Sequence, residues 1–187
     1  MANQEHLDKL KAGIHVWYEW RKQHPEIKPD LSGVDLREAD LWQAGPGLNF
    51  SETNLSHTNL SGAVLCEANL TRANLSGADL SEAFLNNVMM YGANLSGAIL
   101  NRANLSYANL SYANLSMAIL IEVNLNHAIL TGAILKRANL SYASLRKTDL
   151  SDANLAEANL SMATLTKTNL SMSNLSGVIG YNPEVTT

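Results

Sequence analysis

The sequence predicts an all-β solenoid, and three periodic observations support this prediction. Leucine recurs at every fifth position from Leu55 to Leu175, interrupted only by Met90, and Phe50 extends the series by one step. A small residue, most often alanine, stands two positions before each of these central residues, and asparagine usually stands one position before. The commonest five-residue word is Ala-Asn-Leu-Ser followed by a variable residue, as in residues 103–107 and 108–112.

A five-residue period fits neither regular secondary structure. Five residues of an α-helix advance the side chain by about 140° past a full turn, which would scatter leucine over every face. In a flat strand an odd step would alternate leucine between the two faces of the sheet. The chain must therefore turn a corner every five residues, so that the central leucine and the small residue both return to a shared interior. Asparagine and serine suit the corners, because their side chains hydrogen-bond to nearby backbone.

These words resemble those of the pentapeptide-repeat family, whose consensus is A(D/N)LXX with leucine as the central residue, over about 150 of the 187 residues. The resemblance implies a right-handed quadrilateral β-helix with four pentapeptides in each coil, which gives about eight coils. The stretch Trp-Tyr-Glu-Trp-Arg at residues 17–21, which leads through Pro25 to residues 29–33, also resembles cyanobacterial members of the family.

We expect three segments: a capping helix and linker over residues 1–28, the β-helix over residues 29–180 and a C-terminal tail over residues 181–187. The register breaks near residues 42–49, because Leu41 and Phe50 are nine residues apart where ten would keep the period. We interpret the break as the loss of one residue, with Pro46 as a degenerate fourth centre and residues 29–48 as the first coil. Residues 45–47, Gly-Pro-Gly, leave open whether the break is a loop or a distorted corner.

The N-terminal end of an open solenoid needs a cap, because it has unpaired backbone groups and exposed leucines. Leu7, Leu10, Ile14 and Trp17 recur at helical spacing, and Pro25 stops the pattern. Residues 4–23 are therefore predicted to form one capping helix, with the tryptophans packed on the first coil.

At the C-terminal end, Gly180 occupies the position of the next central leucine. We expect the stack to end there, covered by Val178, Ile179 and Tyr181 or by a second molecule. The protein should accordingly be a monomer or an end-to-end dimer through the C-terminal coil.

The sequence has no pattern typical of catalysis, of a cofactor or of a metal. The five histidines are widely separated, and none has the H-x-x-x-H or cysteine-plus-histidine spacing of a metal site. Serine fills one repeat position without a G-x-S-x-G elbow, and Cys66 follows a central leucine on the wall of the coil. Leucine and alanine fill the predicted interior and leave no cavity for a substrate. We therefore expect no enzymatic activity, no cofactor and no metal.

Charge and composition narrow the possible partners. The 17 acidic and 13 basic residues give a formal net charge of −4, which disfavours non-specific binding to nucleic acid or to anionic membranes. No apolar run reaches the roughly 18 residues of a membrane-spanning helix. The single cysteine forms no internal disulfide, and residues 1–15 lack the unbroken apolar run of a secretory signal, so we expect a cytoplasmic protein.

The first functional hypothesis is a structural or protein-interaction module, a rigid rod that presents columns of side chains to an unidentified protein partner. The family resemblance adds an alternative, a DNA-mimicking regulator of a type II topoisomerase (gyrase), and a third reading, a cyanobacterial developmental or stress role. Residues 50–180 carry eight acidic and seven basic residues. Such a nearly neutral rod imitates DNA poorly, since DNA carries one charge per about 1.7 Å. The known mimics also tend to dimerise through a C-terminal helical element, which this sequence lacks after Leu175.

The candidate surface for a protein partner lies in the middle of the rod, on the walls around Tyr107 and Tyr112. These residues and Met117 occupy the exterior position two after the central residue in consecutive pentads. With twenty residues per coil, Tyr107 also begins a column that continues through His127, Lys147 and Lys167, at about 4.8 Å per step. Tyrosine and methionine are enriched in protein interfaces. The alternative is that exposed tyrosine simply packs along a neighbouring strand.

Overall fold

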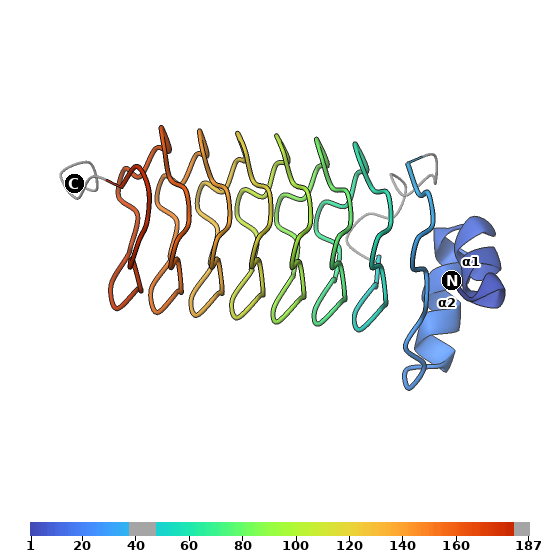
Figure 1. Ribbon diagram of the computed structural model, residues 1–187. Coiled ribbons are helices and arrows are strands. Elements are labelled where there is room, and N and C mark those ends of the chain that lie inside the picture. Colours follow the sequence, from blue (N-terminus) through green and yellow to red (C-terminus); the bar gives the residue numbers. More distant parts are fainter. Residues whose placement is uncertain (38–47, 182–187) are drawn as a thin grey trace.

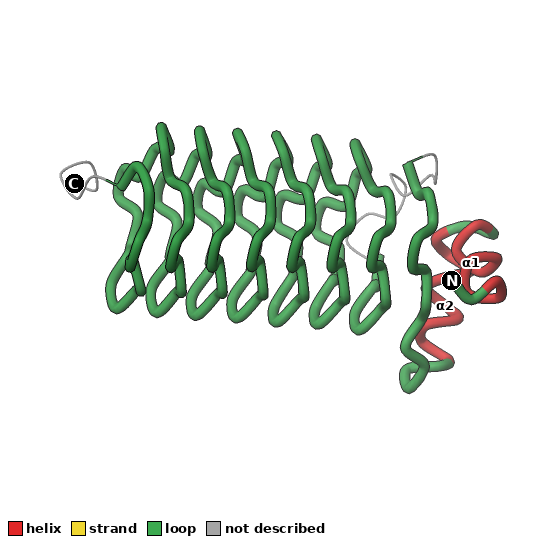
Figure 2. Tube along the Cα trace, in the orientation of Figure 1, coloured by secondary structure: helices red, strands yellow, loops and turns green. Residues whose placement is uncertain are grey.

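The computed structural model describes residues 1–37 and 48–181, which form two short helices followed by a right-handed quadrilateral β-helix (Figure 1). The coils stack along one axis, and the helices lie against the N-terminal end of the rod. The rod is built from turns joined by isolated parallel bridges rather than from long strands (Figure 2). In the described residues, no helix is long and apolar enough to cross a membrane.

Each pentad makes one wall and one corner of a coil, as residues 103–107 illustrate. Ala103 and Leu105 are fully buried in the interior, while Asn104 between them faces outward. The chain then turns, and the backbone N–H of Ala108 donates to the carbonyl of Leu105 at 3.1 Å. Tyr107 occupies the third position of this turn with φ of 61°, as in a type II turn. The same left-handed conformation recurs at the position two after nearly every central residue.

Hydrogen bonds between coils follow one rule throughout the rod. The backbone N–H groups of Leu105 and Tyr107 donate to carbonyls of the next coil, at 2.8 and 3.0 Å. The N–H of Asn104 donates in the opposite direction, to the carbonyl of Ala83 in the preceding coil at 2.9 Å. Every interior coil is therefore paired on both sides, and only the two ends of the rod need other partners.

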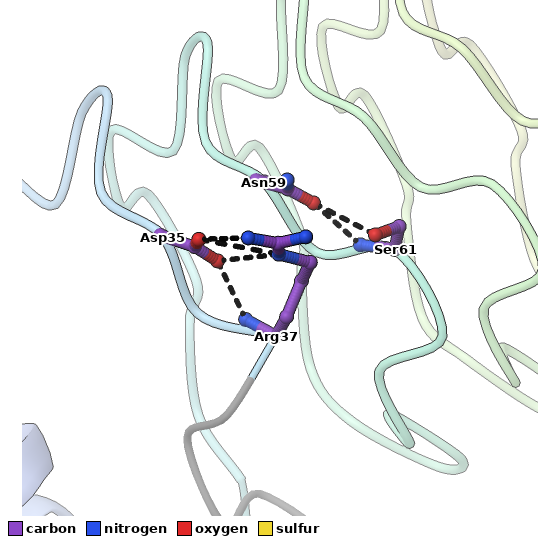
Figure 3. Close-up of polar contacts among 4 residues, drawn as sticks. All are labelled: Asp35, Arg37, Asn59 and Ser61. Carbon is purple, nitrogen blue, oxygen red and sulfur yellow. Dashed lines mark hydrogen bonds and ion pairs between the residues drawn. The ribbon is translucent and has the colours of Figure 1, made fainter.

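The recurrent asparagine stabilises the corner that follows it. Asn59 Oδ1 accepts hydrogen bonds from the backbone N–H and the hydroxyl of Ser61, at 3.1 and 2.9 Å (Figure 3). Asp35 takes this role one coil earlier, where its carboxylate accepts from the backbone N–H and the guanidinium of Arg37. The hydrogen bonds from the Arg37 side chain lower the pKa of Asp35 to about 2. The asparagine at this position thus acts as a local turn acceptor.

The first coil is longer than the others, which corrects the expected loss of one residue. Asp30 pairs with Asn54 and Asp35 with Asn59, whereas Asn49 pairs with Asn69, so the pairing offset falls from 24 residues to 20. Phe50 is therefore the last central residue of the first coil rather than the first of the second. Leu36 and Phe50 are 14 positions apart, which fits either two pentads with four extra residues or three pentads with one residue missing. Spacing alone cannot decide between this insertion and this deletion. Leu41, Pro46 and residues 45–47 lie outside the described residues.

The N-terminal cap consists of two helices, where the sequence predicted one helix over residues 4–23. Helix α1 spans Gln4–Lys11 and helix α2 spans Ile14–Gln23. Gly13, with φ of 112°, lies between them in a conformation that ends the first helix, and glycine adopts it at little cost. The buried apolar side chains of the two helices join the core of the rod; they are Leu7, Leu10, Trp17 and Trp20.

The cap also supplies hydrogen-bond partners to the first wall of the rod. In later coils, the backbone N–H and carbonyl of the residue before the central one both form hydrogen bonds with the preceding coil. No coil precedes Asp30. The backbone N–H of Asn3 donates to the carbonyl of Asp30 at 2.9 Å, and the N–H of Asp30 donates to Nδ1 of His6 at 3.0 Å. Both backbone groups of Asp30 are therefore paired, as burial requires.

Helix α2 performs the same task at the last wall of the first coil. The indole N–H of Trp17 donates to the carbonyl of Asn49 at 2.9 Å. The buried guanidinium of Arg21 donates to the carbonyl of Ser51 at 3.0 Å and to that of Ile27 at 2.6 Å. Burial lowers the pKa of Arg21, and the nearby carboxylate of Glu52 partly offsets this effect. The helices are thus a hydrogen-bonding end plate as well as an apolar cover.

The C-terminal end differs from the N-terminal end. Val178 and Tyr181 pack against the core, as expected, but Ile179 faces outward and pairs with Asn159 at a wall position, so it does not cover the end. Leu170 and Leu175 are only partly buried. Within the described part of the chain, several backbone N–H groups at this end donate to no acceptor, among them those of Leu165, Lys167, Leu170, Met172, Leu175 and Gly177.

Candidate protein-interaction surface

The predicted tyrosines lie at corners of the coil rather than on its walls. Tyr107 and Tyr112 both have φ near 60°, at the third position of consecutive turns. Residues 108–110 form the wall between these two corners, so the two rings lie at opposite borders of one wall. Both side chains are more than half exposed, at 58% for Tyr107 and 59% for Tyr112.

The wall between the tyrosines carries two exposed apolar side chains. Its outward side chains are Met89, Asn109 and Ile129, which are paired in successive coils. Met89 and Ile129 are 47% and 44% exposed, although most pentads have asparagine at this position. We call this wall, with the aromatic residues at its two borders, the tyrosine face; its members are Met89, Asn109, Ile129, Tyr91, Tyr112, Tyr107 and His127.

Ring contacts hold the aromatic side chains of the tyrosine face in place. At one border Tyr107 stacks on His127, with centroids 4.7 Å apart and an interplanar angle of 12°. At the other border Tyr91 meets Tyr112 edge-on, with centroids 5.6 Å apart. The Tyr112 ring lies over Gly132, where a Cβ would come within 2.7 Å of Cε1 of the tyrosine. The rings are therefore pre-positioned, which lowers the entropy lost when a partner binds.

The other predicted residues fall into two groups. Met117 occupies the next corner after Tyr112, so the wall of residues 113–115 separates the two, and Met117 is diagonal to Tyr107. Lys147 and Lys167 continue the column of Tyr107 and His127 along one corner. Three of the six predicted residues therefore belong to the tyrosine face, two continue one of its borders toward the C-terminal end, and Met117 lies apart from them.

The column that begins at Tyr107 becomes basic toward the C-terminal end. We call it the 107–167 ridge, formed by the corner residues Ser106, Tyr107, Asn126, His127, Arg146, Lys147, Thr166 and Lys167. Among the residues that the structure describes, no carboxylate lies within 4.0 Å of the cationic groups of Arg146, Lys147 or Lys167. The ridge therefore carries three positive charges without ion-pair partners.

Three basic residues on other corners are paired instead, although Arg72 has no carboxylate within 4.0 Å among the described residues. Arg102 contacts Glu122 at 3.0 Å, and Glu157 contacts Arg137 at 2.6 Å and Lys136 at 4.0 Å. The hydrogen bond from Arg137 lowers the pKa of Glu157, and the hydrogen bond to Glu122 raises the pKa of Arg102. All these groups are exposed, so the pairs add little stability. They do neutralise the corners on which they lie.

Sequence reasoning missed Met89, Tyr91 and Ile129, which complete the tyrosine face. The available signal was a departure from the repeat: Met89 and Ile129 replace the usual asparagine, and Tyr91 replaces the usual serine. Searching for such departures in pentads five and twenty residues apart would have identified the whole wall.

The arrangement offers no obvious chemistry. Within residues 1–37 and 48–181, no three His, Cys, Asp or Glu side chains are grouped so that they could hold a metal ion. The central leucines and the alanines that fill the interior are almost completely buried. A shallow depression of about 310 Å³ on one corner is lined by Ser81, Glu82, Asn101, Arg102, Ile121 and Glu122, and the Arg102–Glu122 ion pair lies within it.

The fold and this surface define a solenoid protein whose exterior walls and corners are the parts available for binding. The chain belongs to the pentapeptide repeat family. The model of pentapeptide repeats matches 8 copies, over residues 49–87, 89–126, 118–155, 133–171 and 143–179. The search of curated proteins found no match to the chain.

Similar solved structures include other pentapeptide repeat proteins. HetL, involved in heterocyst differentiation regulation in the cyanobacterium Nostoc sp. strain PCC 7120, is 24% identical over 86% of this chain and 91% of its own, with a TM-score of 0.59. The protein alr5209 from Nostoc PCC 7120 is 30% identical over 65% of this chain and 83% of its own, with a TM-score of 0.36. QnrB1, a plasmid-mediated fluoroquinolone resistance protein, is 21% identical over 83% of this chain and 92% of its own, with a TM-score of 0.35. The likeness to HetL concerns the fold.

Proposed function

We propose that the protein is a non-enzymatic interaction module that binds a protein partner through the tyrosine face. The observation that carries the proposal is the exposed apolar wall of Met89 and Ile129 between two bordering pairs of aromatic rings. Exposed apolar groups gathered on one surface are typical of protein-binding sites, whereas single ones are common on any surface. Tyrosine and methionine are also enriched in such interfaces.

Exposure and ring contacts, rather than the backbone, set these tyrosines apart. Tyr107 and Tyr112 occupy a left-handed turn position, which costs roughly 1 kcal/mol for a residue other than glycine, but non-glycine residues fill the same position at most corners of the rod. Both tyrosines are more than half exposed, and contacts with Tyr91 and His127 hold their rings.

Photocrosslinking from a residue on the tyrosine face tests the proposal. A photoreactive benzoylphenylalanine that replaces Asn109 would project from the tyrosine face, and one that replaces Asn139 would project from the opposite wall. Both asparagines accept a hydrogen bond from the backbone N–H of the serine two residues later, so each replacement removes the same kind of turn acceptor. In cells of the source organism, we expect irradiation to attach a protein to position 109 and not to position 139.

Tyrosine substitutions then test the contribution of the rings. The double variant Tyr107→Ala with Tyr112→Ala should weaken binding of the crosslinked partner by more than about tenfold, or 1.4 kcal/mol. Tyr142→Ala is the control, because Tyr142 has the same turn position and is 60% exposed on another corner. Equal crosslinking at both walls, or unchanged affinity of the double variant, would refute the proposal.

The proposal includes a monomer or an end-to-end dimer through the C-terminal coil. Leu170 and Leu175 are partly buried, and the N–H groups beside them have no acceptor among the described residues; both features support the dimer. Leu175→Glu would place a charge in that interface and should convert a dimer into a monomer in light scattering. An unchanged mass of the variant would rule out this interface.

A further inference from the structure

We infer that the segment of the protein partner that docks along the 107–167 ridge is acidic, with an apolar or aromatic side chain at its end over Tyr107. This inference rests on the proposed function and adds the chemistry of the partner. It follows from the distribution of charge along one corner of the rod, from the aromatic stack in the same column and from the fixed spacing of the coils.

The ridge is basic in its last two coils, on an almost neutral rod. From Ser106 to Lys167 its corner positions include three cationic residues and no acidic residue. The outward residues of the wall on one side are Asn104, Asn124, Ser144 and Thr164, which are all uncharged. No described residue therefore neutralises the ridge from that side.

The wall on the other side contains one carboxylate, which is occupied. Asp149 accepts hydrogen bonds from the Thr131 hydroxyl at 3.1 Å, from the Ser151 backbone N–H at 3.0 Å and from Asn169 Nδ2 at 2.9 Å. Burial raises the pKa of Asp149, but the hydrogen bonds from Ser151, Thr131 and Asn169 outweigh it and lower the pKa. The carboxylate is thus held along the wall by its neighbours and forms no ion pair with Lys147.

The aromatic stack gives the ridge a direction. Tyr107 and His127 lie one coil apart with nearly parallel rings, and Lys147 and Lys167 follow in the next two coils. Three coil steps of about 4.8 Å place Lys167 roughly 14 Å from Tyr107. A segment of about ten residues in an α-helix, or of four to five residues in an extended chain, spans this distance. Carboxylates at one end and an apolar group at the other would match the ridge.

The rest of the molecule favours a protein segment over a nucleic acid. The formal net charge is −4, and Asp149 and Asp152 lie in the same coil as Arg146 and Lys147. A nucleic-acid backbone would extend past the ridge and meet this negative charge, whereas a short acidic segment would not. Three cations suffice to select a few carboxylates but provide a small basic surface for a polyanion.

A display experiment with the whole protein tests this inference. Phage that display random peptides of about 12 residues, long enough to span the ridge as a helix, are selected on the wild-type protein. The pool is first depleted on the variant Arg146→Ala, Lys147→Ala, Lys167→Ala. We expect the enriched peptides to be rich in aspartate and glutamate and to contain an aromatic or large aliphatic residue near one end.

Titration of an enriched synthetic peptide then locates the contact. Binding should weaken at least about tenfold in Arg146→Ala with Lys147→Ala, and by less than about twofold in Lys136→Ala with Arg137→Ala. The second pair occupies the same two turn positions on another corner but is already paired with Glu157. Replacing glutamate by glutamine in the peptide should cause a similar loss, and higher salt should weaken binding.

Four outcomes would overturn the inference: neutral or basic enriched peptides, no enrichment, equal losses in the two double variants, or tighter binding of a single-stranded oligonucleotide than of the peptide. The partner crosslinked at position 109 separates this inference from the proposed function. If Tyr107→Ala with Tyr112→Ala weakens binding of that partner but Arg146→Ala with Lys147→Ala does not, the proposed function stands and the acidic segment is refuted. If neither double variant weakens binding, both proposals are refuted.

Discussion

Thr53→Val should stabilise the protein, because it removes a buried hydroxyl that has no partner. Thr53 is fully buried at the position two before central Leu55, and its Oγ1 has no hydrogen-bond partner in the described part of the chain. Three other threonines at this position each donate to the carbonyl of a central residue in the preceding coil: Thr58 to Leu31 at 3.2 Å, Thr148 to Leu125 at 2.7 Å and Thr168 to Leu145 at 2.6 Å.

The position of Thr53 explains why it lacks this bond. In an interior coil, the acceptor would be the carbonyl of the central residue that lies one coil before Phe50. That residue would belong to a wall preceding the one that contains Asp30. Bridges in the described chain begin at Asp30, so no such wall exists. Thr53 therefore has the same buried hydroxyl as the threonines of interior coils, but no preceding coil supplies a carbonyl to accept its hydrogen bond.

The magnitude follows from the cost of an unpaired hydroxyl. A buried polar group without a partner costs roughly 1 to 3 kcal/mol, and valine has nearly the same shape as threonine. Thr53→Val should therefore raise the free energy of unfolding by about 1 to 2 kcal/mol. Thr148→Val removes a satisfied hydrogen bond with a net value of about 0.5 to 1.5 kcal/mol, so it should lower stability or leave it unchanged. Leu125 keeps the hydrogen bond from the Ala128 N–H, so its carbonyl is not orphaned.

Urea denaturation monitored by tryptophan fluorescence measures the effect where it occurs. All three tryptophans precede Phe50 in the sequence, so fluorescence reports the N-terminal end, while circular dichroism reports the whole rod. In thermal melts, a change of 1 kcal/mol in the free energy of unfolding corresponds to about 2 to 4 °C in Tm for a chain of this size. If Thr53→Val destabilises the protein as much as Thr148→Val does, the reasoning about the missing coil is wrong.

Four further predictions address the core, the cap, the charge and the pH dependence. Leu105→Ala should lower the free energy of unfolding by roughly 2 to 5 kcal/mol, because Leu105 is fully buried, while Ser106→Ala should change it by less than about 0.5 kcal/mol; equal effects in denaturant melts would contradict the register. Deletion of residues 1–24 should cause end-to-end association in light scattering, since Asn49 and Ser51 lose the donors from Trp17 and Arg21; a truncated protein that stays monomeric and equally stable would show that the helices are not a cap. The nearly neutral rod should not inhibit DNA supercoiling by gyrase at micromolar concentration, and potent inhibition would instead favour the DNA-mimic alternative. Because the folded-state pKa of Asp149 is lowered, its stabilising contribution is present above the ordinary aspartate pKa and is lost as pH falls through the folded value; Asp149→Asn should therefore be less sensitive than wild type to a shift from about pH 5 to 3 in thermal melts, and identical pH profiles would contradict this.

The sequence predicted the repeating part of the fold because each pentad solves the same local problem. Central leucine, alanine two before it and asparagine one before it have a single arrangement in which the first two are buried and the third supports the turn, as at residues 103–105. The structure confirms the quadrilateral β-helix and the helical cap. The predictions that failed concern the non-periodic parts of the chain. Gly13 divided the predicted helix, and the length of the first coil depended on pairing between Asp30 and Asn54 that linear spacing cannot reveal.

The candidate surface was predicted less completely for a related reason. Tyr107, Tyr112 and His127 could be found because they stand out at a position that is often glycine or charged. Whether they share a wall with Met89 and Ile129 depends on which corner each pentad occupies, and that assignment required the coil register. The ring contacts and the absence of ion pairs on the ridge depend on side-chain geometry, which no spacing rule encodes.

The direction of the hydrogen bonds between coils makes the rod electrically polar along its axis. In each pentad two backbone N–H groups point toward the C-terminal end and one points toward the N-terminal end, as Leu105, Tyr107 and Asn104 show. One peptide dipole per pentad is therefore uncompensated, and successive coils add these contributions in series, with the opposite sense to an α-helix. The N-terminal end is the negative pole, where the guanidinium of Arg21 meets the carbonyls of Ile27 and Ser51. The C-terminal end is the positive pole, and anions approaching the rod along its axis would be drawn to that end.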